Sequence, residues 1–479
     1  MFTILTTLYV ICAFLLTIYA ISQTLLLFIY WIHRRDSLPL PKGGDLPSVT
    51  VQLPIYNERH VVERLLDSCA QLDYPRDRLT IQVLDDSTDE TVSIVADLCT
   101  KWQKAGVNMQ HVRRPDRKGY KAGALAYGMT LVDSELFAVL DADFVPRADF
   151  LCCTVPYFSN NPRLGLVQTR WGHLNPFDNP LTLGQTLSVD AHFVVEQTAR
   201  NRSGMLINFN GSGGVWRASC IREAGGWDDT TLSEDLDLSY RAQLSGWHFL
   251  YLPDVVIPAE LPPQMTAYKL QQARWAKGST QCLTRLLGRV WQERLSLPQR
   301  LVATLHLCQY LPHPLMILLL LLTPPLILMH GFQKLPLGPL GLAGLGPLMV
   351  YVVSQQALYN DWRRRLLVFP VLMALGTGIA WNNTRAVVGG LMGARGEFKR
   401  TPKFGQNKGT NSYALSVDEA MLPEMALALY ALWGVGVALQ HYPPLVPYLA
   451  LYSFAFAGVA LWSLSDTMHW KSPFSAAHH

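Results

Sequence analysis

Charge is scarce in this sequence of 479 residues. Charged side chains make up only 16% of it and apolar side chains 49%, whereas about a quarter of the residues in soluble domains are charged. Part of the chain must therefore avoid water, which favours an integral membrane protein. Blocks of lysine and arginine interleaved with aromatic residues are also missing, and the net charge is only +4, so we expect no nucleic-acid partner.

Cysteine motifs are missing as well. The eight cysteines include no CxxC pair, and no histidine stands at the spacing of a zinc ligand, which argues against the common zinc-binding classes. We expect reduced cysteines in a cytoplasmic core, and we expect the adjacent Cys152 and Cys153 to form no site. Internal repeats and low-complexity tracts are absent from the sequence, so a repeat architecture is not expected.

Long apolar runs are what the sequence does contain. Residues 8–30 form one such run without a cleavage motif close behind it, so we interpret it as a membrane span and not as a signal peptide. The basic segment WIHRRD follows and places that side of the membrane in the cytoplasm. Further apolar runs predict spans near residues 307–329, 341–358, 421–439 and 445–464.

The apolar segment 366–392 needs a different interpretation. It is long enough to cross a membrane, but the basic clusters DWRRR and ARGEFKRTPK flank its two ends, and a single crossing would place one cluster outside. Glycines and the polar residues around Trp381 also interrupt it. We therefore interpret it as an interfacial or re-entrant helix. Five spans remain, with an outside N-terminus and an inside C-terminus.

Short β-rich runs alternate with helical segments between residues 48 and 291, which predicts βαβ units around a mostly parallel sheet. Ligands bind at the carboxyl ends of the strands in such sheets. Asp85 and Asp86 follow one predicted strand, and Asp141 and Asp143 follow another. The predicted domains are 1–47 with one span and a linker, 48–300 with the α/β domain, 301–365 with two spans, 366–420 with the interfacial helix and a loop, and 421–479 with two spans and a cytoplasmic tail.

The Asp-Ala-Asp segment at 141–143 has a pattern that suits a divalent metal ion. Carboxylates at a strand end can hold Mg²⁺ or Mn²⁺, and such an ion neutralises a diphosphate leaving group without proton transfer. A DxD segment occurs often by chance, however, and a solvated turn explains it equally well. A metal site therefore needs the support of other motifs.

Other motifs occur in a fixed order along the chain. Between residues 51 and 275 the sequence contains VQLPIYNE, VLDDSTDET, RKGYKAGAL, LDADF, NFNGSGGVWR, LSEDLDLSYR and QQARW. This ordered set resembles glycosyltransferase family 2, in the D, DxD, ED and QxxRW arrangement of cellulose, hyaluronan and chitin synthases, and is most similar to the plant cellulose synthase-like mannan and glucan synthases. The resemblance implies a Rossmann-like α/β GT-A fold in a cytoplasmic catalytic domain, joined to an α-helical transmembrane region.

The resemblance also implies roles for the matching residues. Asp235 matches the general base that takes the proton of the acceptor hydroxyl, with Glu234 beside it as a second catalytic carboxylate. Glu234 and Asp237 have the alternative of being one face of an amphipathic helix, which we favour for Asp237. Ser233 keeps a hydroxyl at a helix N-cap position. The implied nucleotide-binding residues are Tyr56, Glu58, Asp85, Asp86, Lys121, Asp141 and Arg274, the acceptor-binding residues Phe209, Asn210, Gly211, Ser212, Gln271 and Trp275, and the metal ligands Asp143 and Asp141.

A last match concerns nucleotide binding by a loop. Phe398, Thr401 and Lys403 in EFKRTPKF resemble the FxVTxK gating loop of cellulose synthases, with Arg400 where valine is usual. Four tryptophans and two histidines within the motif region are expected to be structural. These are Trp171, Trp216, Trp227 and Trp247, which we expect in the core, and the lone His173 and His192.

The leading hypothesis is an inverting β-glycosyltransferase that uses UDP-glucose or GDP-mannose to elongate a β-linked glucan or mannan and extrudes it through its own spans. The alternative is a glycolipid synthase that transfers glucose to diacylglycerol or another lipid. A transporter or receptor without catalysis does not explain the full set of carboxylates. We expect a nucleotide-sugar donor, a polysaccharide or lipid acceptor, the lipid bilayer and Mg²⁺ or Mn²⁺ as partners, and the plasma (cell inner) membrane as the location.

Overall fold

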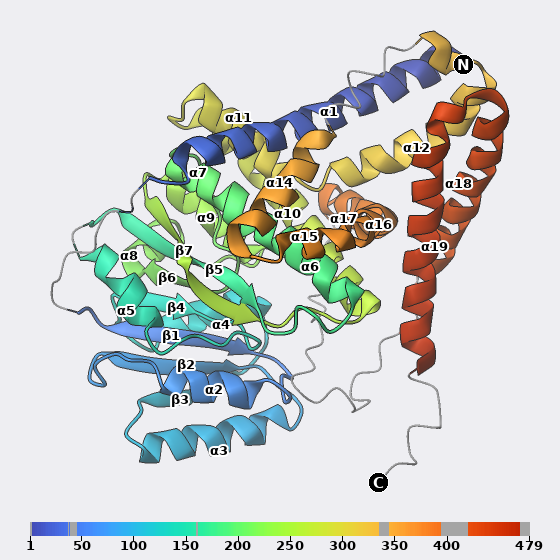
Figure 1. The fold of residues 1–479 in the computed structure, drawn as a ribbon. Coiled ribbons are helices and arrows are strands. Elements are labelled where there is room, and N and C mark those ends of the chain that lie inside the picture. The colour runs from blue at the N-terminus through green and yellow to red at the C-terminus, as the bar shows by residue number, and fades with distance from the viewer. Residues whose placement is uncertain are drawn as a thin grey trace.

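One mixed sheet of seven strands forms the centre of the α/β domain in the computed structural model, which describes residues 2–36, 38, 46–159, 161–334, 344–393 and 420–469. The order across the sheet is β3-β2-β1-β4-β6-β5-β7 (Figure 1). β6 runs antiparallel to β4 and β5, and the other neighbouring pairs are parallel. The strands are β1 (Val49–Ile55), β2 (Leu79–Asp85), β3 (Met109–Val112), β4 (Leu136–Val139), β5 (Leu164–His173), β6 (Gly214–Arg217) and β7 (His248–Ala259).

The predicted mostly parallel sheet is confirmed, and four of its strands, β1, β2, β4 and β5, lie where the β-rich runs of the sequence predicted them. β3 and β6 have four residues each, too few to show a period of two. β7 was missed because it contains Pro253 and Pro258, and proline argues against a central strand. β7 lies at the edge of the sheet, where proline is tolerated.

The domain buries apolar side chains on both faces of the sheet. β4 is a continuous apolar run, as expected for a strand that is covered on both sides. Leu136 and Ala138 belong to one core cluster, and Phe137 and Val139 belong to the other, because successive side chains of a strand point to opposite faces. The apolar residues of α2 recur at helical spacing and pack into the first cluster; these are Val62, Leu65, Leu66 and Cys69.

Eleven helical segments follow the strands or lie between them in the described part of this domain, including a short 3₁₀-helix, η1 (Val155–Phe158). A π-helix, η2 (His192–Gln197), joins α6 to α7, and π-helical turns are common near functional sites. All eight cysteines are free thiols; Cys152 is exposed and Cys153 is partly buried on α5. The α-helices are α2 (Val62–Ala70), α3 (Thr91–Lys104), α4 (Tyr120–Met129), α5 (Phe150–Thr154), α6 (Pro180–Ala191), α7 (Thr198–Arg202), α8 (Ala218–Glu223), α9 (Glu234–Leu244) and α10 (Met265–Gln292).

Apolar helices form the second part of the molecule (Figure 1). Three of them, α1 (Phe2–His33), α18 (Met421–His441) and α19 (Val446–His469), are long and apolar enough to cross a membrane. The number rises to five if each of two bent helix pairs in the described segments counts as one span. The chain is therefore an integral membrane protein. The shorter helices are α11 (Leu297–Leu307), α12 (Pro312–Leu328), α14 (Leu345–Leu358), α15 (Trp362–Arg365), α16 (Phe369–Gly378) and α17 (Ala380–Leu391).

The predicted division into five spans and one interfacial segment stays a prediction. α1, α18 and α19 coincide with three of the predicted spans. α12 and α14, at the other two, have 17 and 14 residues, fewer than the roughly 20 that a straight crossing needs. The segment predicted to be interfacial is broken, because the helix from Trp362 to Gly378 meets α17 at an angle of 41°.

Candidate active site

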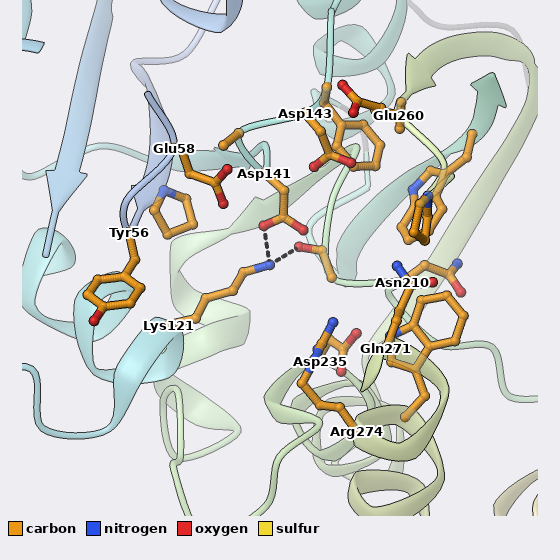
Figure 2. Close-up of a pocket in the computed structure, with 18 of the residues that line it drawn as sticks. Tyr56, Glu58, Lys121, Asp141, Asp143, Asn210, Asp235, Glu260, Gln271 and Arg274 are labelled. Atoms are coloured by element: carbon orange, nitrogen blue, oxygen red, sulfur yellow. Dashed lines mark hydrogen bonds and ion pairs between the residues drawn. The ribbon is translucent and has the colours of Figure 1, made fainter. Parts of the chain in front are cut away.

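A cavity lies at the carboxyl ends of β1 and β4, between the first turn of α9 and the N-terminal part of α10 (Figure 2). In that view Asp143 and Glu260 lie together at one end, Asp235 and Arg274 lie at the other, and Lys121 stands between them. The fold thus brings together most of the residues that the sequence motifs selected. Those that line the cavity are Tyr56, Glu58, Asp86, Lys121, Asp141, Asp143, Asn210, Gly211, Glu234, Asp235, Gln271, Arg274 and Trp275.

Lys121 links the Asp-Ala-Asp segment to the loop that precedes β6. Its Nζ donates hydrogen bonds to Oδ1 of Asp141 at 2.5 Å and to the carbonyl of Gly211 at 2.7 Å, and it lies 3.9 Å from Glu234. Burial opposes the charge of Lys121, but Asp141 and Glu234 together raise its pKa above the ordinary value. Lys121 therefore stays charged and offsets part of the negative charge of the site.

Asp235 stands in the first turn of α9, where its Oδ1 accepts a hydrogen bond from the backbone N–H of Leu236 at 2.8 Å. Burial and the neighbouring Glu234 raise the pKa of Asp235 to about 7, against the opposing effects of Lys121 and Arg274. A carboxylate whose pKa is raised toward neutrality is a better proton acceptor than an ordinary one, which suits a general base.

Gly211 lets its loop approach the Asp235 carboxylate closely. Its φ is +84°, and a Cβ atom added there would lie 3.0 Å from Oδ2 of Asp235 and 3.6 Å from Nζ of Lys121. Any side chain at this position would therefore enter the space between Asp235 and Lys121, and it would also strain the backbone.

The expectation for Ser233 is only half met. It occupies the N-cap position of α9, but its side chain makes no capping hydrogen bond. Its hydroxyl instead faces Gly278 of α10, where no Cβ atom stands in the way. Ser233 thus allows α9 and α10 to approach each other at the cavity wall.

The end of the cavity opposite α10 combines aromatic and cationic side chains. The guanidinium of Arg117 lies 3.3 Å from the centre of the Tyr56 ring, and burial lowers its pKa. Arg114 binds both carboxylate oxygens of Asp86, at 2.8 and 2.6 Å. Arg117 stands in the RKGYKAGAL motif, yet sequence reasoning assigned it no role. A flat ring beside fixed polar groups is suited to a nucleobase.

Several predicted site residues lie behind the cavity instead of lining it. Asp85 is buried and accepts hydrogen bonds from the Ser87 backbone at 2.8 Å and from His111 at 2.8 Å. Phe209 is buried with its ring 5.6 Å from that of Trp216. The hydroxyl of the buried Ser212 accepts a hydrogen bond from the backbone N–H of Asp141. These residues support the cavity wall. Phe398, Thr401 and Lys403 lie outside the described residues.

The residues expected to be structural divide into three groups. Trp216, Trp227 and Trp247 lie in the core as predicted, whereas Trp171 lines the cavity. Asp237, for which we favoured a place on one face of an amphipathic helix, is buried and forms an ion pair with Arg241 at 2.7 Å. The two histidines have acidic partners: His173 lies 2.8 Å from Asp190 and His192 lies 3.2 Å from Glu196.

A second cavity continues from the first into the apolar helices. Both cavities are lined by Asp235, Asn210 and Trp275, so the candidate base stands in their common wall. The second cavity extends between α1, α12, α14 and α16. Its lining carries polar and aromatic side chains far from the sheet, among them Tyr19, Gln23, His306, Gln309, Tyr310, His313 and Tyr351.

The cavity offers carboxylates for a divalent ion but no complete ligand set. Asp141, Asp143, Glu58 and Glu260 all contribute to its lining, and carboxylates are the ligands that Mg²⁺ and Mn²⁺ prefer. Within the described residues, no three His, Cys, Asp or Glu side chains are grouped so that they could hold a metal alone. The donor set therefore fits an ion of the kind that takes one or two protein carboxylates and completes its shell with substrate phosphate and water.

Comparison with known proteins identifies the α/β domain. The family described as glycosyltransferase like family 2 matches residues 47–278. Glucomannan 4-beta-mannosyltransferase 9 of Arabidopsis thaliana is 44% identical over 248 residues, which cover 51% of this chain and 46% of the relative. Probable glucomannan 4-beta-mannosyltransferase 6 of Oryza sativa subsp. japonica is 47% identical over 239 residues, which cover 49% and 42%. This chain thus spans less than half the length of these relatives.

A solved structure shows the same fold. The mannosyltransferase PcManGT from Pyrobaculum calidifontis, in complex with GDP-Man and Mn²⁺, matches 81% of this chain and all of its own chain, with a TM-score of 0.54 and 22% sequence identity. At this identity the likeness concerns the fold alone. The predicted family is confirmed for the domain at residues 47–278, and the predicted GT-A fold is confirmed as well.

Proposed function

Residues 47–278 form a glycosyltransferase family 2 domain, and from this premise we propose that the chain is a membrane-embedded, inverting glycosyltransferase that elongates a β-linked mannan or glucan. GDP-mannose is the first candidate donor and UDP-glucose the second. The names of the relatives, which are glucomannan 4-beta-mannosyltransferases, support mannose as the transferred sugar. The neighbouring structure, which contains GDP-Man, agrees with that choice of donor.

The observation that carries the proposal is the position of Asp235 in the wall between two cavities. The donor occupies the first cavity, and the acceptor reaches the base from the second. The second cavity favours a polysaccharide acceptor over a lipid, because Gln23, Gln309 and His313 in its lining can hydrogen-bond to sugar hydroxyls. Aromatic residues such as Tyr310 and Trp275 offer flat faces to sugar rings.

Each of several cavity residues has one role in the proposed reaction. Asp235 accepts the proton of the acceptor hydroxyl. At the same time, the oxygen of that hydroxyl forms a bond to the anomeric carbon of the donor sugar. The bond from that carbon to the phosphate oxygen breaks, and the electron pair leaves with the nucleoside diphosphate. One in-line displacement inverts the anomeric centre, so an α-linked donor gives a β-linked product. Arg274 and Lys121 stabilise the negative charge that develops on the leaving group.

Mg²⁺ or Mn²⁺ is the proposed cofactor, with Asp143 as its main protein ligand and Asp141 as the second. Bound there, it would neutralise the diphosphate of the donor. Asp141 is already paired with Lys121, which leaves Asp143 as the stronger candidate of the two. We place the domain on the cytoplasmic side of the membrane, since the basic segment after α1 adjoins it. The plasma (cell inner) membrane is the proposed location.

The proposal is tested with the purified full chain in detergent or nanodiscs. Radiolabelled GDP-mannose and UDP-glucose are supplied separately, and the products are separated into a chloroform-soluble fraction and an ethanol-insoluble polymer. We expect label from GDP-mannose in a polymer that endo-β-mannanase digests. Label in the chloroform fraction would instead indicate a glycolipid synthase, and no incorporation from either donor would contradict the proposed activity.

A further inference from the structure

A buried ion pair joins the C-terminal membrane helices to the helix that carries the QxxRW motif. Nζ of Lys269 in α10 lies 2.6 Å from Oε1 and 2.7 Å from Oε2 of Glu424 in the first turn of α18. The two side chains are only 2% and 0% exposed. The residues stand 155 positions apart in the chain, so the contact is a tertiary link between two separate parts of the molecule.

Two further hydrogen bonds hold the same end of α10. Oδ2 of Asp466 in α19 accepts a hydrogen bond from the backbone N–H of Met265 at 2.7 Å, which satisfies a helix N-terminus and suits its positive dipole. Asn382 of α17 donates its Nδ2–H to the carbonyl of Lys269 at 3.0 Å. Three membrane-side helices therefore contact the first turns of α10 through polar groups.

The fixed part of α10 is the part that lines the candidate active site. Tyr268, Gln271, Arg274 and Trp275 all contribute to the cavity wall, and Lys269 lies between the first two in sequence. Each residue adds only about 1.5 Å to the length of a helix, so Arg274 and Trp275 lie within two turns of Lys269. A shift or rotation of the first turns of α10 therefore moves both side chains. A displacement of about 1 Å can cost on the order of 10²-fold in rate.

We propose that α18 and α19 are a positioning device for the QxxRW segment, in which Glu424 and Asp466 hold α10 so that Arg274 and Trp275 face the donor and the acceptor. The inference rests on the proposed function. Glu424 and Asp466 are positioning residues and do not touch the substrate. The ion pair is a strict constraint because loss of one partner leaves the other charge buried without compensation.

The test compares variants that break the link with one that weakens the packing of α18 and α19 elsewhere. Lys269→Met/Glu424→Leu removes both charges at similar volume, and Asp466→Ala removes the carboxylate at the start of α10. Leu449→Ala is the matched control, because Leu449 is buried in a helix cluster of the described region that includes no residue of α10. For each protein we would measure kcat, the KM for the donor, the Kd of the nucleoside diphosphate and the thermal midpoint.

We expect kcat to fall about tenfold or more in the double variant, and by a smaller factor in Asp466→Ala, with weaker nucleotide binding in both. Leu449→Ala should lower the thermal midpoint while leaving the kinetics of the folded protein unchanged. Asp466→Ala keeps the buried pair intact and so provides a test even if the double variant does not fold. Wild-type kcat and Kd in every folded variant of the link would overturn the inference, whereas an inactive wild-type protein would overturn the proposed function instead.

Discussion

Lys121 and Asp141 form a direct ion pair, 2.5 Å from Nζ to Oδ1, in the middle of the candidate active site. The pair means that one carboxylate of the Asp-Ala-Asp motif is matched by a cation of the protein itself. It also places the same cation 3.9 Å from Glu234, so the charge of the donor side and the charge around the base are coupled.

Replacement of the base should abolish turnover without loss of binding. Asp235→Asn keeps the shape of the side chain but cannot accept the proton, so kcat should fall by on the order of 10² or more. Isothermal titration with the nucleoside diphosphate should give a Kd close to that of the wild-type protein. Glu223→Gln, an exposed change on α8, serves as the control. Near-normal turnover of Asp235→Asn would remove this residue from the mechanism.

The pH dependence of kcat/KM should reflect the pKa of Asp235 in the free enzyme. Its pKa is raised to about 7 and the base must be deprotonated to act, so activity should be lost as the pH falls through that value. Lys121 lowers this pKa, and Lys121→Met should therefore move the acidic limb of the profile to higher pH. The shape of the curve, and not its height, is the measurement. An unchanged limb would show that the two groups are not coupled.

Removal of divalent ions should silence the enzyme. EDTA is expected to abolish incorporation of label, and added Mg²⁺ or Mn²⁺ should restore it, because the leaving diphosphate needs neutralisation. Asp143→Asn should lower the affinity for Mn²⁺ measured in the presence of nucleotide, whereas Asp149→Asn, a change at a half-buried carboxylate outside the cavity lining, should not. Full activity in EDTA would show that the carboxylates of the motif have another role.

Membrane sidedness can be tested by labelling single cysteines. Cysteines placed at Arg364 and Lys399, in a background without native cysteines, are expected to resist an impermeant thiol reagent in intact cells, because both basic clusters are predicted to be cytoplasmic. An exposed cysteine on the predicted outer side provides the positive control. Labelling of position 399 from outside would exclude contact of Phe398, Thr401 and Lys403 with the nucleotide.

The sequence alone predicts those parts of the site that depend only on residues close together in the chain. Asp141 and Asp143 were correctly placed after a strand because a buried apolar run ends directly before them. Asp85 and Asp86 show the limit of this reasoning. Successive side chains at a strand end point to opposite sides, so Asp86 lines the cavity and Asp85 faces His111 behind it. The residue types in a sequence motif do not show which of two adjacent carboxylates faces the ligand.

The remaining differences come from tertiary contacts. Glu260 follows β7, and the two prolines of β7 argue against a strand at this place in the sequence. No sequence pattern therefore indicated that Glu260 lines the cavity. Asp237 has the spacing of a helix face, but Arg241 and the packing of α9 bury it. The link between Lys269 and Glu424 joins segments whose apolar periodicity gives no information about their relative placement.

Gly211 offers a way to disable the protein by shape alone. A methyl group at this position would fill the gap between Asp235 and Lys121 while leaving every ionisable group of the chain in place. Gly211→Ala would therefore serve as a reference protein in living cells, with the same net charge as the active form. Changes in cell-wall composition seen with the active chain but not with this reference could then be ascribed to sugar transfer, and not to the mere presence of a foreign protein in the bilayer.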